Sequence, residues 1–149
     1  MSRLKNQDLF HWLVNFANKF FKMMMGEKRC IGIIFGGNSN EHEISISSAK
    51  TVFNAFHSKV NLERFTIKVF FINKKGTWFN NEESKRILVG GDRKVVDDAN
   101  KILNRDKINF LEKIEMNSID IWFPLLHGLN GEDGAIHGFL KFTEKPVVG

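Results

Sequence analysis

The sequence has 149 residues, of which 42% are hydrophobic and 26% are charged, and it contains only two prolines. This length matches one domain with a substantial core and is too short for most two-domain enzymes. The composition excludes the disordered, collagen-like and low-complexity classes of protein.

The formal net charge of +5 is concentrated near the N-terminus. Residues 1–30 hold six basic and two acidic side chains, whereas the rest of the chain holds 16 basic and 15 acidic ones. The body of the chain is therefore nearly neutral, and we expect no nucleic-acid partner. Binding of the basic N-terminal segment to a membrane surface or to nucleic acid is a minor alternative.

The number of cysteines indicates the cellular compartment of the protein. Cys30 is the only cysteine, so the chain cannot form an intramolecular disulfide. It also lacks Cys or His neighbours at the spacing of a zinc site. We expect a cytoplasmic protein in which Cys30 is a small buried residue of a strand.

Residues 1–28 differ in pattern from the rest of the chain. Apolar residues recur there at helical spacing and predict an amphipathic helix: Leu9, Leu13, Phe16, Phe20 and Met24. No apolar run approaches the roughly 18 residues of a membrane-spanning helix, so we expect no stable membrane insertion. The extension is either an interfacial or partner-binding helix, or sequence upstream of a true start at residues 23–25. We favour the second, because residues 26–29 then form a short polar lead-in to a strand.

The first structural unit is predicted to be a strand, a glycine-rich loop and a helix. Residues 30–35 form a continuous apolar run that stops at Gly36-Gly37, as in a strand buried on both faces. A loop covers residues 38–43. A helix with a buried stripe that includes Ser48 then ends near His57.

The middle of the chain is predicted in part. Residues 65–72 form the second strand, and residues 73–76 form a turn into a short strand over 77–79, which together resemble a hairpin. We make no firm prediction for residues 80–117.

A third strand is predicted over residues 119–126, followed by a glycine-rich loop over 127–134. A helix begins after this loop with Asp133 placed to cap it, and residues 146–149 start another strand. Strands that alternate with helices predict an α/β, Rossmann-like three-layer domain with a mainly parallel sheet flanked by helices.

Two loops carry the candidate functional residues, because ligands bind beyond the carboxyl ends of strands in such sheets. The loop over 36–45 matches neither a dinucleotide fingerprint nor a phosphate-binding P-loop. It offers two carboxylates, Glu41 and Glu43. By spacing alone, a structural role for these charges at the start of a helix is the favoured interpretation.

The loop over 127–134 carries His127, Glu132 and Asp133 among three glycines. The glycines permit positive φ and close backbone approach, so the loop can fold tightly over a small ligand. A compact connection with no ligand is about as well supported. His42 and His137 are expected at the surface or as helix caps.

Together, the two loops resemble the N-terminal domain of D-alanine–D-alanine ligases. The resemblance rests on Gly-Gly-x-Ser-x-Glu-His-Glu-x-Ser at 36–45 and Leu-His-Gly-x-x-Gly-Glu-Asp-Gly at 126–134, in this order. It covers residues 30–149 and is weak across 80–117. It implies a pre-ATP-grasp domain over residues 29–149 that lies ahead of an ATP-grasp domain outside this sequence.

The resemblance also implies residue roles. Glu41 matches the glutamate that holds the ammonium of the first D-alanine and belongs to the catalytic set. The other substrate-binding residues that it implies are His127, Glu132, Gly36, Gly37 and Ser45. A carboxylate suits an ammonium, and an imidazole can orient a neighbouring carboxylate. No cofactor-binding or metal-binding residue is expected within this sequence.

Such ligases join two D-alanine molecules through an acyl phosphate for peptidoglycan synthesis, and they use ATP and Mg²⁺ or Mn²⁺. The resemblance places the residues that bind this cofactor and metal beyond Gly149, so we expect the 149 residues alone to be inactive. It also implies a homodimer of the whole enzyme. The alternative is a free-standing α/β module that binds a small molecule without catalysis.

Overall fold

The computed structural model describes residues 26–90, 93–101 and 116–149. Residues 1–25, which carry the predicted amphipathic helix, lie outside the described residues. The elements follow in the order β1 (Arg29–Gly36), α2 (His42–Phe56), α3 (Lys59–Arg64), β2 (Phe65–Ile72), α4 (Asn81–Gly90), α5 (Arg93–Lys101), the 3-10 turn η2 (Met116–Ser118), β3 (Ile121–Pro124) and α7 (Ala135–Lys141).

The three strands form one parallel sheet in the order β2-β1-β3. In register, Ile33 of β1 lies opposite Val69 of β2 and Phe123 of β3. The carboxyl ends of β1, β2 and β3 therefore meet at one edge of the sheet, and the loops that follow them are neighbours. The expected three-layer α/β fold is confirmed.

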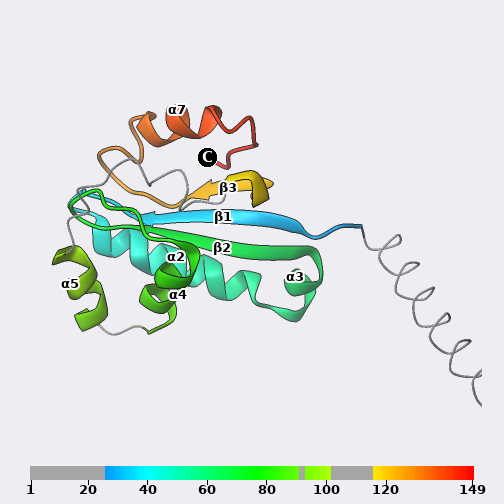
Figure 1. Cartoon of the computed structure of the whole chain (residues 1–149), viewed down its shortest axis with the longest axis horizontal. Coiled ribbons are helices and arrows are strands. Elements are labelled where there is room, and N and C mark those ends of the chain that lie inside the picture. The colour runs from blue at the N-terminus through cyan, green and yellow to red at the C-terminus, as the bar shows by residue number, and fades with distance from the viewer. Residues whose placement is uncertain (1–25, 91–92, 102–115) are drawn as a thin grey trace, which may run out of the picture.

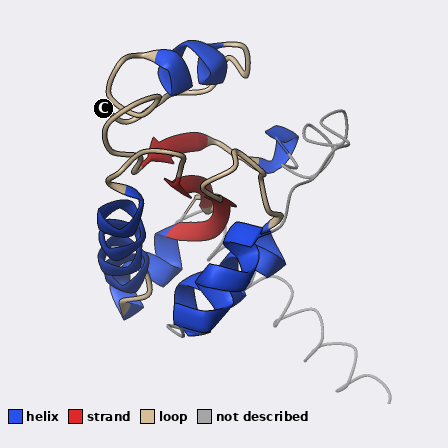
Figure 2. Ribbon diagram, turned by 90° about the vertical axis from the view of Figure 1, so that its left-hand side faces the viewer, coloured by secondary structure: helices blue, strands red, loops and turns tan. Residues whose placement is uncertain are grey.

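Helices cover both faces of the sheet. Figure 1 shows α7 on one face and α2 and α4 on the other, and Figure 2 shows the same layers end-on. Ile31, Ile33 and Phe35 of β1 pack with α2 and α4, whereas Cys30 and Ile34 pack on the side of α7. Successive side chains of a strand point to opposite faces, so burial on both faces accounts for the unbroken apolar run of β1.

Polar side chains of α4 accept hydrogen bonds from the backbone of the edge strand β2. The backbone N–H of Val69 donates to Asn81 Oδ1 at 3.0 Å, and that of Phe71 donates to Ser84 Oγ at 2.8 Å. Unpaired backbone groups at a sheet edge favour aggregation. Asn81 and Ser84 thus close part of this edge and fix α4 against the sheet.

Most predicted elements are confirmed, with shorter bounds in places. β3 spans four residues of the predicted range 119–126. The predicted hairpin after β2 consists of a single antiparallel bridge, between Ile72 and Trp78. In the predicted last strand, Val147 forms a parallel bridge with Trp122, so this segment begins to extend the sheet beyond β3.

The region without a firm prediction contains α4 and α5, while residues 102–115 lie outside the described residues. Cys30 is buried in β1, as expected. Within the described part of the chain, no helix has the length and apolar character needed to cross a bilayer.

Gly32, in the middle of β1, offers a test of the packing between β1 and β3. A Cβ at this position would lie 2.7 Å from two ring carbons of Trp122 and 3.0 Å from Ile119 Cγ2. We expect Gly32→Ala to lower the free energy of unfolding by about 1–3 kcal/mol, measured by urea denaturation, because overpacking forces neighbours to move.

Gly138→Ala in α7 is the matched control, because a Cβ there meets no atom within 4 Å. This change should leave the protein as stable or raise its stability by up to about 1 kcal/mol. Equal effects of the two substitutions would contradict the described contact between β1 and β3.

Candidate functional site

The loops that follow β1 and β3 lie side by side at the carboxyl edge of the sheet. β1 and β3 are adjacent parallel strands, and the pairing continues past β3, where Leu125 N–H donates to Ile34 O at 2.7 Å. The two candidate loops predicted from the sequence, 36–45 and 127–134, are therefore brought together.

Ser45 joins three segments at the base of the site. Its hydroxyl accepts from the backbone N–H of Gly36 at 2.7 Å and donates to the carbonyl of Leu125 at 2.6 Å. The residue is fully buried. The expectation that Ser45 contacts substrate does not fit this burial, and its hydroxyl instead ties the ends of β1 and β3 to α2.

Ser39 makes a second connection nearer the surface. Its hydroxyl donates to the carbonyl of His127 at 2.6 Å and accepts from the backbone N–H of Glu41 at 3.1 Å. Gly128 lies against this contact, since a Cβ there would be 3.3 Å from Ser39 Cβ and 3.7 Å from the carboxyl carbon of Glu41. Ser39 thus places Glu41 and His127 next to each other.

Glu41, His127 and Glu132 converge where the two loops meet. Each offers one nitrogen or oxygen ligand atom, and these three atoms lie within 4.8 Å of one another. His127 Nδ1 is 3.5 Å from Glu132 Oε1, and both carboxylates are solvent-exposed. Two carboxylates beside an imidazole form a charged cluster, and the carboxylate oxygens are acceptors suited to an ammonium group or a metal cation.

The second loop is shaped by its glycines and by Asp133. Gly128 and Gly134 have φ of 71° and 85°, as expected for glycine. Gly131, for which the sequence permits either a positive φ or a close backbone approach, is not among the positive-φ residues. It is required because a Cβ there would lie 2.6 Å from the carbonyl oxygen of Leu126.

Asp133 caps α7 as predicted, although Gly134 is the residue at the N-cap position. Its carboxylate accepts from the backbone N–H groups of Ala135 at 3.0 Å and Asn130 at 2.9 Å. The bonds from Ala135 and then Asn130 lower the pKa of Asp133, because they stabilise its charged form. Asp133 therefore shapes the loop and does not join the cluster of Glu41, His127 and Glu132.

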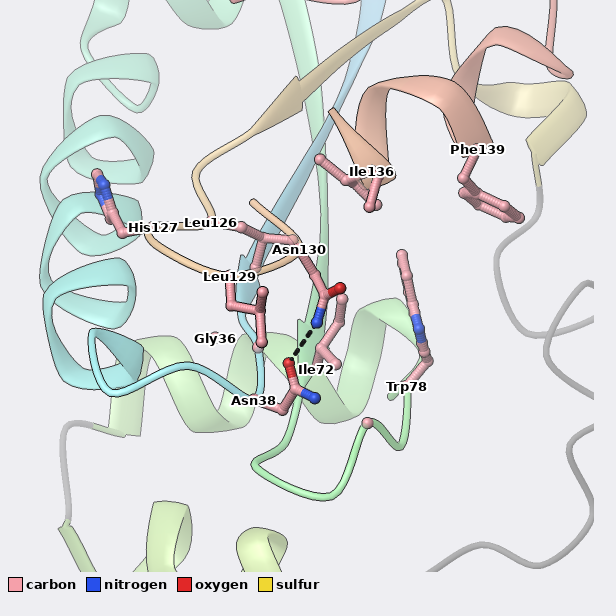
Figure 3. Close-up of a pocket in the computed structure, with 13 residues that line it drawn as sticks. Gly36, Asn38, Ile72, Trp78, Leu126, His127, Leu129, Asn130, Ile136 and Phe139 are labelled. Carbon is pink, nitrogen blue, oxygen red and sulfur yellow. Dashed lines mark hydrogen bonds between the residues drawn. The ribbon is translucent and has the colours of Figure 1, made fainter. Parts of the chain in front are cut away.

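An apolar pocket of about 320 Å³ lies on the α7 side of the same loops. Figure 3 shows the amides of Asn38 and Asn130, two of its lining residues, pointing toward each other, and they form a hydrogen bond of 2.9 Å. The His127 side chain points away from the pocket, toward α2. Its other walls include Ile72, Trp78, Leu126, Leu129, Ile136 and Phe139.

Gly36 and Gly37 also line this pocket, both with positive φ near 90°. A Cβ on Gly36 would lie 2.2 Å from the carbonyl oxygen of Ile72, so no other residue fits between β1 and β2 at this point. Gly37 N–H donates to the same carbonyl at 2.7 Å. The Gly-Gly pair therefore turns the chain sharply at the end of β1.

The expectation that His42 lies at the surface is wrong. The residue is 1% exposed, its ring packs edge-on against Phe71, and its Nδ1 bonds to the carbonyl of Gly37 at 2.5 Å. Nε2 is buried and has no hydrogen-bond partner among the described residues. Burial lowers the pKa of His42, because desolvation penalises the charged imidazole. His137 is half-buried, and its Nε2 is also enclosed.

Comparison with known proteins identifies the family. Residues 30–149 match the family model described as the D-ala D-ala ligase N-terminus. The chain belongs to this family.

Relatives within the family include proteins named D-alanine–D-alanine ligase from Prochlorococcus marinus. The protein of strain AS9601 is 58% identical over 127 residues, which make up 85% of this chain and 36% of the relative. That of strain NATL2A is 44% identical over 126 residues, or 85% of this chain and 34% of the relative. The chain thus spans about a third of the length of these relatives.

Solved structures of the family share the fold. The VanG D-Ala:D-Ser ligase of Enterococcus faecalis is 30% identical with a TM-score of 0.58, over 82% of this chain and 36% of that one. The D-alanine–D-alanine ligase of Coxiella burnetii is also 30% identical, with a TM-score of 0.59, over 83% of this chain and 35% of that one.

Sequence reasoning missed one member of the site in this family domain. Ser48 Oγ lies 3.2 Å from His127 Nε2. Residues 41, 45 and 48 follow helical spacing, i, i+4 and i+7, so they share one face of α2. That spacing was a usable signal, but Ser48 had been assigned to the buried stripe of the helix.

His42 generates a prediction about pH. The unfolded chain takes up a proton near the ordinary pKa of 6.5, whereas the folded chain does so only at lower pH. The free energy of unfolding should therefore fall as the pH drops below 6.5, by up to about 1.4 kcal/mol per pH unit until the folded pKa is reached. Urea denaturation at a series of pH values measures this slope.

His42→Asn should reduce this slope, because it keeps a donor for Gly37 O but removes the titrating ring. His57→Asn is the control, since His57 is exposed while its Nδ1 also bonds a backbone carbonyl. An unchanged slope in His42→Asn would show that His42 does not govern the acid sensitivity.

Proposed function

We propose that residues 29–149 form the substrate-binding domain of an ATP-dependent D-alanine–D-alanine ligase, and that residues 1–28 are an extension ahead of it. The observation that carries this proposal is the convergence of Glu41, His127 and Glu132 at the carboxyl edge of the sheet. These residues come from the two motifs by which the chain resembles the family.

The chemistry of the cluster suits the ammonium group of D-alanine. An ammonium donates three hydrogen bonds and accepts none, so it needs several acceptors that converge on one point. The carboxylates of Glu41 and Glu132 supply them, and charge-assisted bonds of this kind are the strong ones. In this proposal Glu41 is the primary partner of the ammonium.

The remaining residues support that contact. His127 lies 3.5 Å from Glu132 and orients its carboxylate. Gly36 and Gly37 are implied as substrate-binding residues by the resemblance, and they line the pocket on the other side of the same loops. Ser45 acts on the site only by holding the two loops in place.

ATP and Mg²⁺ are assigned to residues outside this chain. ATP would supply the phosphoryl group that activates the carboxylate of the first D-alanine. The sequence contains no Gly-Lys-Ser/Thr motif, and the first loop offers carboxylates where phosphates need cationic or N–H donors. The residues present do not fit a nucleotide, so we expect the 149-residue chain alone to show no D-alanine-dependent ATP hydrolysis.

The second substrate is proposed to be D-alanine, giving the dipeptide used in peptidoglycan. The relatives at 58% identity carry this name, whereas the VanG structure, at 30% identity, carries the name of a D-Ala:D-Ser ligase. We further propose a cytoplasmic location, where ATP is available, and a homodimer of the whole enzyme.

Substitution of Glu41 tests the proposal in the longer protein that carries this chain. Glu41→Gln keeps the size but removes the charge, so we expect the KM for the first D-alanine to rise about 10- to 100-fold while the KM for ATP changes little. D-alanine-dependent phosphate release measures both constants.

Glu43→Gln is the matched control. Glu43 lies in the first turn of the same helix and is exposed, but it pairs with Lys74 at 3.7 Å and is not part of the cluster. It should leave both constants nearly unchanged. Equal, small effects of the two substitutions would return Glu41 to the role of a charge at the helix start.

A further inference from the structure

The imidazole of His127 is held from two sides. Its Nδ1 lies 3.5 Å from Glu132 Oε1 in the second loop, and its Nε2 lies 3.2 Å from Ser48 Oγ on α2. The backbone carbonyl of the same residue accepts from Ser39 Oγ. Both the main chain and the ring of His127 are therefore fixed to the segment that carries Glu41.

We propose that Ser48 is a positioning residue that fixes the ring orientation of His127, so that Nδ1 faces the Glu132 carboxylate and carries the proton. This inference rests on the proposed function, in which Glu41 and Glu132 hold the ammonium of D-alanine and His127 orients Glu132. Ser48 acts through His127 and not on the ligand itself.

The hydrogen bond to Ser48 selects one of two ring orientations. A rotation of the imidazole by about 180° about its Cβ–Cγ bond exchanges the positions of Nδ1 and Cδ2 and those of Nε2 and Cε1. After such a rotation a carbon would face Glu132 and another carbon would face Ser48. The flipped ring loses both polar contacts, so Ser48 makes the observed orientation the favoured one.

The ring orientation that Ser48 fixes also determines the tautomer. A carboxylate only accepts hydrogen bonds, so the nitrogen that faces Glu132 is favoured to carry the proton. In the neutral ring Nε2 is then an acceptor, and the Ser48 hydroxyl donates to it. If the ring gains a second proton, Nε2–H donates to the same hydroxyl, which accepts. A hydroxyl thus serves both protonation states of His127, whereas an alanine serves neither.

Ser48 lies at the position of α2 from which a side chain can reach His127. Ser48 follows Ser45 by three residues and Glu41 by seven, so all three lie on one face of the helix. Ser45 is fully buried with its hydroxyl bonded to two backbone groups, whereas Ser48 is half-buried beside the cluster. Glu41 at the N-cap of α2 therefore supplies the carboxylate that faces the ligand, Ser45 holds the two loops together, and Ser48 bonds to the imidazole.

The test is nitrogen-15 NMR of the histidine rings in the 149-residue chain, with the His127 signals assigned by their loss in His127→Gln. In the unsubstituted chain at a pH where the ring is neutral, His127 should show the Nδ1–H tautomer. Ser48→Ala releases the ring from the orientation in which Nδ1 faces Glu132, so the share of this tautomer should fall toward that of free imidazole side chains, which favour Nε2–H. Alanine has a higher helix propensity than serine, so α2 should persist.

Two further variants sharpen the result. Ser48→Thr keeps the hydroxyl and should retain the Nδ1–H tautomer. Ser47→Ala changes the neighbouring exposed serine of the same helix and should leave the His127 signals unchanged. Loss of helical structure would affect all the histidine signals alike, whereas the proposal expects a change at His127 alone.

Unchanged His127 nitrogen shifts in Ser48→Ala would overturn the proposal, and so would a threonine variant that behaves like the alanine one. Failure of the proposed function is a separate result. In that case the tautomer would respond to Ser48 as expected, but the KM for D-alanine in the longer protein would not respond to Glu41→Gln.

Discussion

The buried hydroxyl of Ser45 is the contact on which the geometry of the site depends. It accepts from Gly36 N–H at the end of β1 and donates to Leu125 O just past β3, while its own backbone belongs to α2. In a parallel sheet the loops beyond neighbouring strands are close, but this proximity alone does not fix their relative position. Ser45, with Ser39 above it, joins the loop that carries Glu41 to the loop that carries His127 and Glu132. Ser39 and Ser45 of the first motif therefore hold the two loops together, and Glu41 is exposed next to them.

The two joined loops have different surroundings on their two sides. Toward α2 lies the polar cluster of Glu41, His127 and Glu132, which is exposed and rich in acceptors. Toward α7 lies the apolar pocket, which is lined in part by Asn38 and Asn130, whose amides form a hydrogen bond. In the proposed function, the polar side binds the ammonium of D-alanine. A substrate held at the polar cluster would thus be oriented by its charged end, which suits an enzyme that must activate the other end, the carboxylate.

The fold was predictable from the sequence where burial produces a simple pattern. β1 and β2 were placed correctly because strands buried on both faces give continuous apolar runs. α4 was missed although Asn80, followed three residues later by Glu83, is the sequence pattern of a capping box at the start of a helix. In the structure Asn80 Oδ1 accepts from Glu83 N–H, and Glu83 Oε2 accepts from Asn80 N–H. The burial of His42 was not predictable, because it depends on contact with Phe71, 29 residues away in the chain. For the site, the motifs indicated Glu41, His127 and Glu132, but only the arrangement of α2 against the second loop shows that Ser45 is a scaffold residue and that Ser48 contacts His127.

The central claim is that Glu41 and its neighbours hold the ammonium group of the first D-alanine. A crystal structure of the proposed D-alanine–D-alanine ligase that includes this domain, determined with D-alanine bound, tests it most directly. The account predicts the ammonium nitrogen within hydrogen-bond distance of the Glu41 carboxylate, on the α2 side of the two loops. A D-alanine whose ammonium is bound elsewhere, with Glu41 left in contact only with solvent and its own helix, would contradict it.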